Sequence, residues 1–384
     1  MSKNDKYTKL LEFIRTLYGN GAQIPLHVPC FAGNEKKYLE ECIDTTMVSS
    51  VGPFVDRFEA MMREITGARY AIATTNGTAA LHMAFILAGV KDGEEVITQP
   101  LTFVATCNAI VYERAIPVFV DVDRDTLGMS PQALKEFLEK NCERRGNLCV
   151  NSISGRRIAA VAPMHTFGHP VRITDIVDIC SEWGLPVIED AAESLGSYVK
   201  GLHTGTFGMI GAFSFNGNKT VTCGGGGCIV TNDEAIGKKA KYLTTTAKVP
   251  HPWSYFHDQV GYNYRLPNLN AALACAQLEQ LNGFLKNKRE TALAYAKFCR
   301  SEEINFISEP ANCTSNYWLN AIVLDSLNER NSFLELAHSR GIMARPIWTL
   351  MNKLPMFSQA HQEHIDNAVW LEQRVVNLPS SYRR

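Results

Sequence analysis

The sequence predicts an α/β fold, in which a mainly parallel seven-stranded sheet is covered by helices and is followed by a smaller α+β domain. Between about residues 53 and 265, short apolar runs alternate with helical stretches, which is typical of strands buried on both faces of a sheet. After about residue 265 long helical runs dominate. A chain of 384 residues, of which 46% are hydrophobic, is long enough for more than one domain.

The elements are expected in the following order. An amphipathic helix is predicted over residues 5–18, where Leu10, Leu11, Ile14 and Leu17 recur at helical spacing. The seven strands are expected over 71–74, 95–98, 117–122, 158–163, 185–190, 211–215 and 227–231, with helices over 78–89, 103–114, 130–140 and 173–183. Helices over 269–300 and 329–339 and a strand over 320–324 complete the chain. These predict an N-terminal helix and arm (1–40), a large domain (41–265) and a small C-terminal domain (266–384).

Composition argues against several classes of protein. The formal net charge of -1 gives no basic excess for a nucleic acid or an anionic membrane. The first ten residues are polar, unlike a signal peptide, and no run reaches the roughly eighteen apolar residues of a membrane span. Eleven scattered cysteines without a CxxC pair suggest reduced thiols, and no metal site is predicted. We expect a cytoplasmic protein that binds neither nucleic acid nor membrane.

The first candidate site is the turn Asn76-Gly77-Thr78, between a predicted strand and a predicted helix. Free backbone N–H groups and the helix dipole favour an anion at such a turn. Gly77 would let a phosphate approach closely, and Thr78 could cap the helix and bind the phosphate. An ordinary strand–turn–helix with a threonine cap has the same pattern, so this turn alone does not decide.

The second and third candidates also follow predicted strands. Asp190 ends a buried apolar strand, where open α/β sheets bind ligands, and a carboxylate this deep needs a cationic partner. That partner is either a ligand nitrogen or a core arginine. Glu193 follows three residues later. Lys219 lies in a small, polar turn five residues after Ser214, where a partly desolvated pocket would favour a nucleophilic amine. A solvated surface lysine is the alternative.

The order of these features is more specific than any one of them. A phosphate turn, an aromatic residue after a strand (Phe103), a strand-end aspartate, a serine and a lysine follow one another. Together they would supply a binding site for a phosphate, an aromatic ring to stack on a flat ligand, a partner for a ring nitrogen and an amine for a covalent link. Those are the contacts that pyridoxal phosphate needs from a protein.

The same stretches resemble the DegT/DnrJ/StrS family of sugar aminotransferases, which have the fold type I (aspartate aminotransferase-like) architecture. The resemblance runs from about Ile24 to Leu378. It rests on NGTAAL (76–81), LTFVAT (101–106), PVFVDVD (117–123), EDAAESLGS (189–197), GTFG (205–208), SFNGNKT (214–220) and GYNYRLPNLNAAL (261–273).

The resemblance implies a role for each candidate residue. Lys219 would carry pyridoxal phosphate covalently and move the proton during amino transfer, with pyridoxamine phosphate as the intermediate form of the cofactor. The other cofactor contacts would be Asp190 at the ring nitrogen, Glu193 at the phenolic oxygen, Phe103 on the ring face, and Gly77, Thr78 and Ser214 at the phosphate. Asn263 would reach the phosphate of the cofactor in a second subunit, which implies a homodimer with shared sites. A loop asparagine that satisfies its own backbone is the alternative for Asn263.

A narrower likeness is to enzymes that make legionaminic acid and bacillosamine precursors. It rests on VSSVGPFVDRFE (48–59), LTTTAK (243–248) and SNYWL (315–319). It implies that a UDP-2-acetamido-2,6-dideoxy-4-keto-hexose is converted to the 4-amino sugar, with L-glutamate as donor. The implied substrate contacts are Thr46, Met47, Val48, Ser49, Arg345 and Trp348, although Trp348 is equally a core aromatic. Asn352 and Thr246 stand where that group usually has His and Gln, and the chain ends soon after LPSS (378–381), so the exact sugar stays open.

Three alternatives remain at this point. One is amino transfer to GDP-linked 4-keto-6-deoxymannose, as in GDP-perosamine synthases. A pyridoxal phosphate-dependent sugar dehydratase is disfavoured because such relatives carry His where this chain has Lys219. A non-catalytic regulator with the same fold is disfavoured by the intact Lys219 and Asp190. His165, which follows a predicted strand near the site, is as well explained by a structural role.

Overall fold

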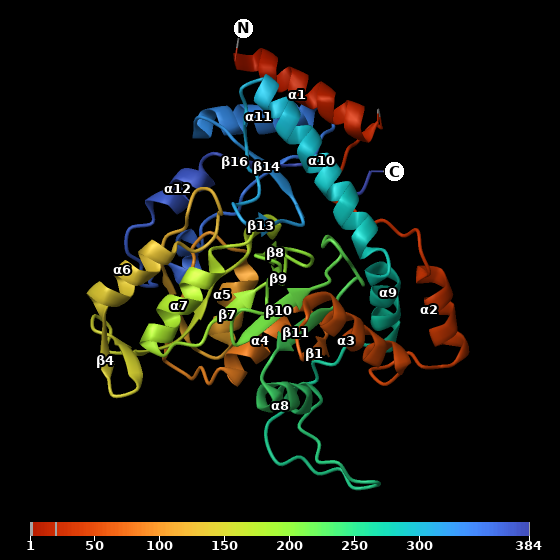
Figure 1. Ribbon diagram of the computed structural model, residues 1–384, viewed down its shortest axis with the longest axis vertical. Helices are drawn as coiled ribbons and strands as arrows, with labels where there is room; N and C mark the ends of the chain where they lie inside the picture. Colours follow the sequence, from red (N-terminus) through yellow and green to blue (C-terminus); the bar gives the residue numbers. More distant parts are fainter. Residues whose placement is uncertain (1–2, 20, 384) are drawn as a thin grey trace.

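The computed structural model describes residues 3–19 and 21–383, and its largest feature is a mixed sheet built from two hydrogen-bonded parts (Figure 1). The first part has the order β1 (Tyr70–Thr74), β11 (Gly227–Thr231), β10 (Ile210–Ser214) and β7 (Ile188–Asp190). The second has the order β3 (Ile116–Phe119), β2 (Glu95–Thr98), β6 (Arg157–Ala162), β5 (Leu148–Asn151) and β4 (Cys142–Arg145).

The two parts meet between β6 and β7. Val161 N donates to Pro186 O at 3.0 Å, and Asp190 N donates to Pro163 O at 2.9 Å. The main sheet therefore runs β1-β11-β10-β7-β6-β2-β3, and β11 is the strand that runs antiparallel to its neighbours. This confirms the predicted mainly parallel sheet.

Helices cover both faces of this sheet because successive strand residues point to opposite sides. On β1, Ile72 packs with residues of α4 (Gly77–Leu87) and α8 (Glu234–Thr244). Its neighbours Ala71 and Ala73 pack instead with residues of α3 (Pro53–Thr66) and α9 (Asn268–Leu278). The remaining large-domain helices are α5 (Val104–Tyr112), α6 (Pro131–Asn141) and α7 (Ile173–Trp183).

A second, antiparallel sheet lies in the C-terminal part of the chain. Its order is β12 (Asn305–Phe306), β14 (Asn320–Val323), β16 (Val375–Leu378) and β15 (Arg345–Pro346). Side chains of α1 (Lys3–Tyr18), α10 (Leu281–Ser301) and α11 (Leu327–Ser339) share one apolar core with this sheet, and Figure 1 shows the three helices together. The first helix thus packs on the C-terminal region, whereas the division of the chain at residues 40 and 265 stays a prediction.

Several elements were not expected from the sequence. They are α2 (Glu35–Asp44), α3, α8, α12 (Asp366–Glu372), the β4–β5 hairpin, the strands β12, β15 and β16, and a small sheet of β13 (Cys313–Thr314), β8 (Tyr198–Val199) and β9 (Leu202–His203). Signals for α3 were present, because Pro53 stands in its first turn and Gly67 ends it at φ 75°. Within the described residues, no helix is long and apolar enough to cross a membrane.

Candidate active site

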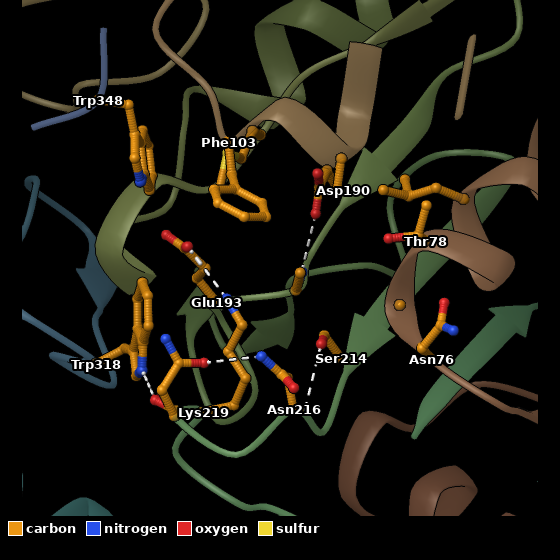
Figure 2. A pocket seen from close by; sticks show the side chains of 16 residues that line it. Asn76, Thr78, Phe103, Asp190, Glu193, Ser214, Asn216, Lys219, Trp318 and Trp348 are labelled. Atoms are coloured by element: carbon orange, nitrogen blue, oxygen red, sulfur yellow. Dashed lines mark hydrogen bonds and ion pairs between the residues drawn. The ribbon is translucent and has the colours of Figure 1, made fainter. Parts of the chain in front are cut away.

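A cavity of about 310 Å³ lies where the carboxyl ends of β7 and β10 meet the start of α4 (Figure 2). Its volume falls in the range of small-molecule sites. Seven of the residues predicted for the cofactor or substrate line it, namely Gly77, Thr78, Phe103, Asp190, Glu193, Ser214 and Lys219, and an eighth is Trp348. The carboxyl edge of a mainly parallel sheet is where α/β folds bind ligands.

The start of α4 forms one wall of the cavity. The helix begins at Gly77, and its cap is Asn76, whose Oδ1 accepts from Ala79 N at 2.8 Å. The expectation that Thr78 caps the helix was therefore wrong, because the extended backbone of a cap residue falls two positions earlier, at Asn76. Thr78 instead lies in the first turn and lines the cavity. A Cβ on Gly77 would lie 2.7 Å from the Cβ of Ser214, so only glycine allows this close approach.

Asp190 lies at the end of β7, and its side chain is 2% exposed. Thr106 Oγ1 donates to Oδ2 at 2.6 Å, and Ala192 N donates to Oδ1 at 3.1 Å. Burial raises the pKa of Asp190, and these two hydrogen bonds and the positive charge of Lys219 oppose the rise. A buried carboxylate of this kind gains from a cation placed beside it, which a protonated ring nitrogen provides.

Lys219 enters the cavity from the turn after β10. Its Nζ lies 3.2 Å from Glu193 Oε1 and 4.1 Å from the centroid of the Trp318 ring (Figure 2). Glu193 is buried, and its Oε2 accepts from Phe167 N at 2.9 Å. Burial raises the pKa of Glu193 to about 7, although the Lys219 charge lowers it. The lysine amine thus faces a carboxyl that can hold or release a proton near neutral pH.

Two aromatic residues border the opposite side of the cavity. Phe103 immediately precedes α5 and is 49% exposed, and its ring centroid lies 6.3 Å from that of Trp348 at an interplanar angle of 59°. An exposed ring beside a cavity is suited to stack on a flat ligand. Trp348 contacts the same cavity rather than lying sealed in the core.

The remaining predicted residues lie outside this cavity. Thr46, Met47, Val48 and Ser49 are exposed in the segment after α2, which is held by Asn268 N donating to Ser49 O at 2.6 Å. Arg345 is exposed on β15. Asn263 is also exposed, and its Oδ1 accepts from Arg265 Nε at 2.9 Å. Their assignments to the substrate and to a second subunit stay predictions.

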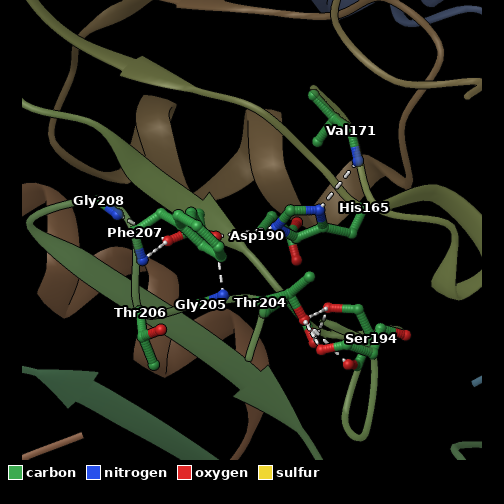
Figure 3. Close-up of polar contacts among 12 residues, drawn as sticks. His165, Val171, Asp190, Ser194, Thr204, Gly205, Thr206, Phe207 and Gly208 are labelled. Atoms are coloured by element: carbon green, nitrogen blue, oxygen red, sulfur yellow. Dashed lines mark hydrogen bonds and ion pairs between the residues drawn. The ribbon is translucent and has the colours of Figure 1, made fainter. Parts of the chain in front are cut away.

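His165 belongs to a structural network beneath the site (Figure 3). Its Nε2 lies 3.0 Å from Glu189 Oε2, and its Nδ1 accepts from Val171 N at 3.2 Å. Glu189 also accepts from three backbone N–H groups of the GTFG stretch, those of Gly205, Phe207 and Gly208, each at 2.7 Å. The buried carboxylate of Glu189 thus accepts hydrogen bonds at both oxygens, and these bonds hold the GTFG turn against β7.

Some functional residues escaped sequence reasoning. Trp318 supplies a wall of the cavity, and its Nε1 donates to Asn218 O at 2.7 Å. Thr106 orients Asp190. Both had a local signal, since Thr106 closes the stretch LTFVAT and Trp318 stands in SNYWL. Neither stretch indicated which residue Thr106 or Trp318 would contact, because their partners Asp190 and Asn218 lie far away in the sequence.

The residues of the cavity fit pyridoxal phosphate. The glycine-lined start of α4 accepts a phosphate, the buried Asp190 suits a protonated ring nitrogen, the Phe103 face suits the ring, and the Lys219 amine suits the aldehyde. The chemistry of the donor set therefore matches each part of that cofactor.

Comparisons with known proteins agree with this geometry. Residues 29–383 match the model of the DegT/DnrJ/EryC1/StrS aminotransferase family. EpsN of Bacillus subtilis, whose name describes a pyridoxal phosphate-dependent aminotransferase, is 38% identical over 93% of this chain and 91% of its own. The GDP-perosamine synthase of Escherichia coli O157:H7 is 36% identical over 93% of both chains.

Solved structures share the fold at lower identity. PseC of Helicobacter pylori, an aminotransferase involved in the biosynthesis of pseudoaminic acid, superposes with a TM-score of 0.84 at 22% identity over 93% of both chains. The aminotransferase TlmJ of Streptoalloteichus hindustanus gives a TM-score of 0.84 at 24% identity, again over 93% of both chains. The architecture is thus fold type I. This chain is a pyridoxal phosphate-dependent sugar aminotransferase that belongs to the DegT/DnrJ/EryC1/StrS aminotransferase family.

Proposed function

We propose that this enzyme moves the amino group of L-glutamate to the C4 keto group of a nucleotide-linked 4-keto-6-deoxy sugar. The observation that carries the proposal is the meeting of Lys219, Glu193 and Asp190 in one cavity whose far side is the helix start at Gly77. Bound pyridoxal phosphate supplies the aldehyde that accepts the amino group and the ring that withdraws electrons.

Four residues of the cavity would then each have a separate role in amino transfer. Lys219 holds the cofactor before amino transfer, and its freed Nζ carries a proton between the substrate carbon and the cofactor. Glu193, which lies 3.2 Å from that Nζ, can exchange a proton with it because burial raises the pKa of Glu193 to about 7. Asp190 keeps the ring nitrogen protonated, and Phe103 holds the ring plane.

For the acceptor we propose a UDP-linked 2-acetamido-2,6-dideoxy-4-keto-hexose, supported by the stretches VSSVGPFVDRFE, LTTTAK and SNYWL. A GDP-linked 4-keto-6-deoxymannose is the second candidate. Three curated relatives named GDP-perosamine synthase, which are 31–36% identical over 93% of this chain, favour it. Either product would serve the synthesis of bacterial surface glycans. The eleven free cysteines suit a reducing compartment such as the cytoplasm.

Assays with the two nucleotide sugars separate the candidates. With L-glutamate as donor, we expect kcat/KM for the UDP-linked keto-sugar to exceed that for the GDP-linked one by at least about tenfold, the least that one mismatched group in a pocket costs. Product is measured by chromatography of the amino sugar, and Lys219→Ala protein is the blank. A higher kcat/KM for the GDP-linked sugar would replace the first candidate by the second.

We further propose that two copies of the chain share their sites through an aromatic arm, residues 248–260. In Figure 1 this segment extends beyond α8, away from the rest of the protein. It folds back on itself, with Val249 N donating to Phe256 O at 2.9 Å. Trp253, Tyr255 and Val260 are 80%, 81% and 79% exposed. Large apolar side chains rarely face water in such a group unless a partner covers them, and Asn263 follows directly.

Replacing Trp253 and Tyr255 together with serine tests the arm. The dimer dissociation constant, measured by sedimentation, is expected to rise at least about a hundredfold, because buried interface aromatics often each contribute more than 1–2 kcal/mol. Leu293→Ser, which changes a similarly exposed residue on α10 (60%), is the control. A wild-type chain that sediments as a monomer, or a double variant that dimerises as tightly as wild type, would contradict the proposal.

A further inference from the structure

A buried lysine lies behind the active-site cavity and has no part in the roles described above. Lys288, on α10, is 3% exposed. Its Nζ lies 2.8 Å from His27 Nε2, and it donates to Ser380 O at 2.9 Å and to Trp318 O at 3.1 Å. Three acceptors therefore surround the three protons of an ammonium group.

Folding alone does not favour this arrangement. In residues 3–19 and 21–383, no carboxylate forms an ion pair with Lys288. A buried charge without an opposite charge costs stability. Local arrangements that oppose stability are concentrated at functional sites.

Trp318 connects Lys288 to the site. Its carbonyl oxygen accepts from Lys288, its Nε1 donates to Asn218 O at 2.7 Å, and its ring lies under Lys219 Nζ at 4.1 Å. One residue thus contacts both lysines and also holds the turn that carries Lys219. Figure 2 shows the Trp318 ring beside the Lys219 side chain.

The space around Lys288 is not a second ligand site. His27, Thr220 and Lys288 line a cavity of about 10 Å³, which has room for about one water molecule. Thr220 directly follows Lys219, so this cavity lies against the back of the active-site turn. Lys288 must therefore act on the known site rather than on a ligand of its own.

We propose that Lys288 is a positioning residue that holds Trp318 beside Lys219, and with it the turn that carries Lys219. The proposal rests on Lys219 as the residue that carries the cofactor. A charged donor makes a stronger hydrogen bond than a neutral one, so the ammonium form of Lys288 holds the Trp318 carbonyl more tightly than the neutral amine does.

The groups that face both lysines set the pH range of this effect. His27 faces Lys288 from the N-terminal segment, and burial, with the charges of Lys288 and Lys219, lowers the pKa of His27 well below its usual value, so the imidazole is neutral. Cys30 and Tyr382 line the same small cavity. On the far side of Trp318, Glu193 Oε1 lies 3.2 Å from Lys219 Nζ. Burial lowers the pKa of Lys288 to about 7, so its charge is present in acid solution and is lost as the pH rises through 7.

The test follows the capture of pyridoxal phosphate by purified protein stripped of cofactor, using the absorption band of the lysine-linked cofactor. At pH 6.5, Lys288→Gln and Lys288→Met are expected to capture the cofactor about tenfold more slowly than wild type. A tenfold loss is the order expected when a hydrogen bond from a charged donor to the Trp318 carbonyl is removed. At pH 9 the difference should shrink, because Lys288 is then neutral in the wild type too.

The variants separate charge from packing. Gln keeps an amide donor for the carbonyls of Trp318 and Ser380, whereas Met keeps only the volume of the side chain. Lys286→Met, which alters an exposed lysine of the same helix, is the control. Equal capture rates at pH 6.5, or an equal slowing at both pH values together with a lower melting temperature, would overturn the role of Lys288. If wild type captures no cofactor, or if Lys219→Ala captures it as wild type does, the assignment of Lys219 fails instead.

Discussion

Lys219→Ala is expected to lower kcat by at least about a thousandfold while leaving the fold intact. In the proposed mechanism the variant loses both the covalent link to the cofactor and the group that moves the proton, and acid–base catalysis alone typically contributes a hundred- to ten-thousandfold. The side chain of Lys219 is 12% exposed and its ion pair is with Glu193. The substitution therefore leaves the Glu193 carboxyl without its ion-pair partner. Because burial already raises the pKa of Glu193 to about 7, this carboxyl can stay protonated at little cost in stability.

The measurements are turnover with L-glutamate and keto-sugar, the absorption band of the lysine-linked cofactor, and the melting temperature. Lys219→Arg keeps the positive charge beside Glu193 and Trp318 but cannot form the covalent link, so it should be as inactive as the alanine variant. Lys200→Ala changes an exposed lysine of the same domain and should behave as wild type. Normal turnover by either Lys219 variant would show that another amine carries the cofactor.

The parts of the site that were predictable lie at the ends of predicted strands. Asp190 ends one predicted strand and Lys219 lies four residues after the end of another at Phe215, and neighbouring parallel strands bring their carboxyl ends to one edge of the sheet. The order of strands along the chain therefore places these side chains together without knowledge of packing. The Gly77 turn was ambiguous alone, and the resemblance implied that Gly77 and Ser214 both contact the phosphate; the two residues lie side by side, since a Cβ on Gly77 would be 2.7 Å from Ser214 Cβ.

The contributions of the C-terminal region were not predictable in this way. Trp318 reaches the cavity from just before β14 and contacts a turn 100 residues earlier in the chain. The pairing of Lys288 with His27 spans 261 positions. Such contacts depend on how the second sheet and α10 pack against the first, and hydrophobic periodicity carries no information about that packing. The roles of Thr46–Ser49 at the substrate and of Asn263 at a second subunit stay predictions, because these residues lie outside the cavity.

Asp190→Asn is expected to lower kcat/KM by on the order of a hundred- to a thousandfold, the usual cost of removing one charge placed to stabilise a reacting system. The amide has nearly the shape of the carboxylate. Its oxygen can still accept from Ala192 N, and its NH₂ group can donate to the Thr106 hydroxyl, which now donates to Asp190 Oδ2 at 2.6 Å. In the proposed mechanism, the variant loses the negative charge that would keep the ring nitrogen of the cofactor protonated, and with it the electron-withdrawing power of the ring.

Stability measurements distinguish this electrostatic role from a structural one. Because burial raises the pKa of Asp190, its carboxylate is destabilised in the protein without cofactor, and Asp190→Asn should melt at the same temperature as wild type or higher. Wild type should gain more in melting temperature than the variant when pyridoxal phosphate is added, because only the carboxylate pairs with the ring nitrogen. Thr106→Val, which removes only the hydroxyl that orients Asp190, should cost about tenfold in kcat/KM. If Asp190→Asn keeps wild-type turnover, or if it loses turnover only because the protein without cofactor unfolds, Asp190 is not the partner of the ring nitrogen.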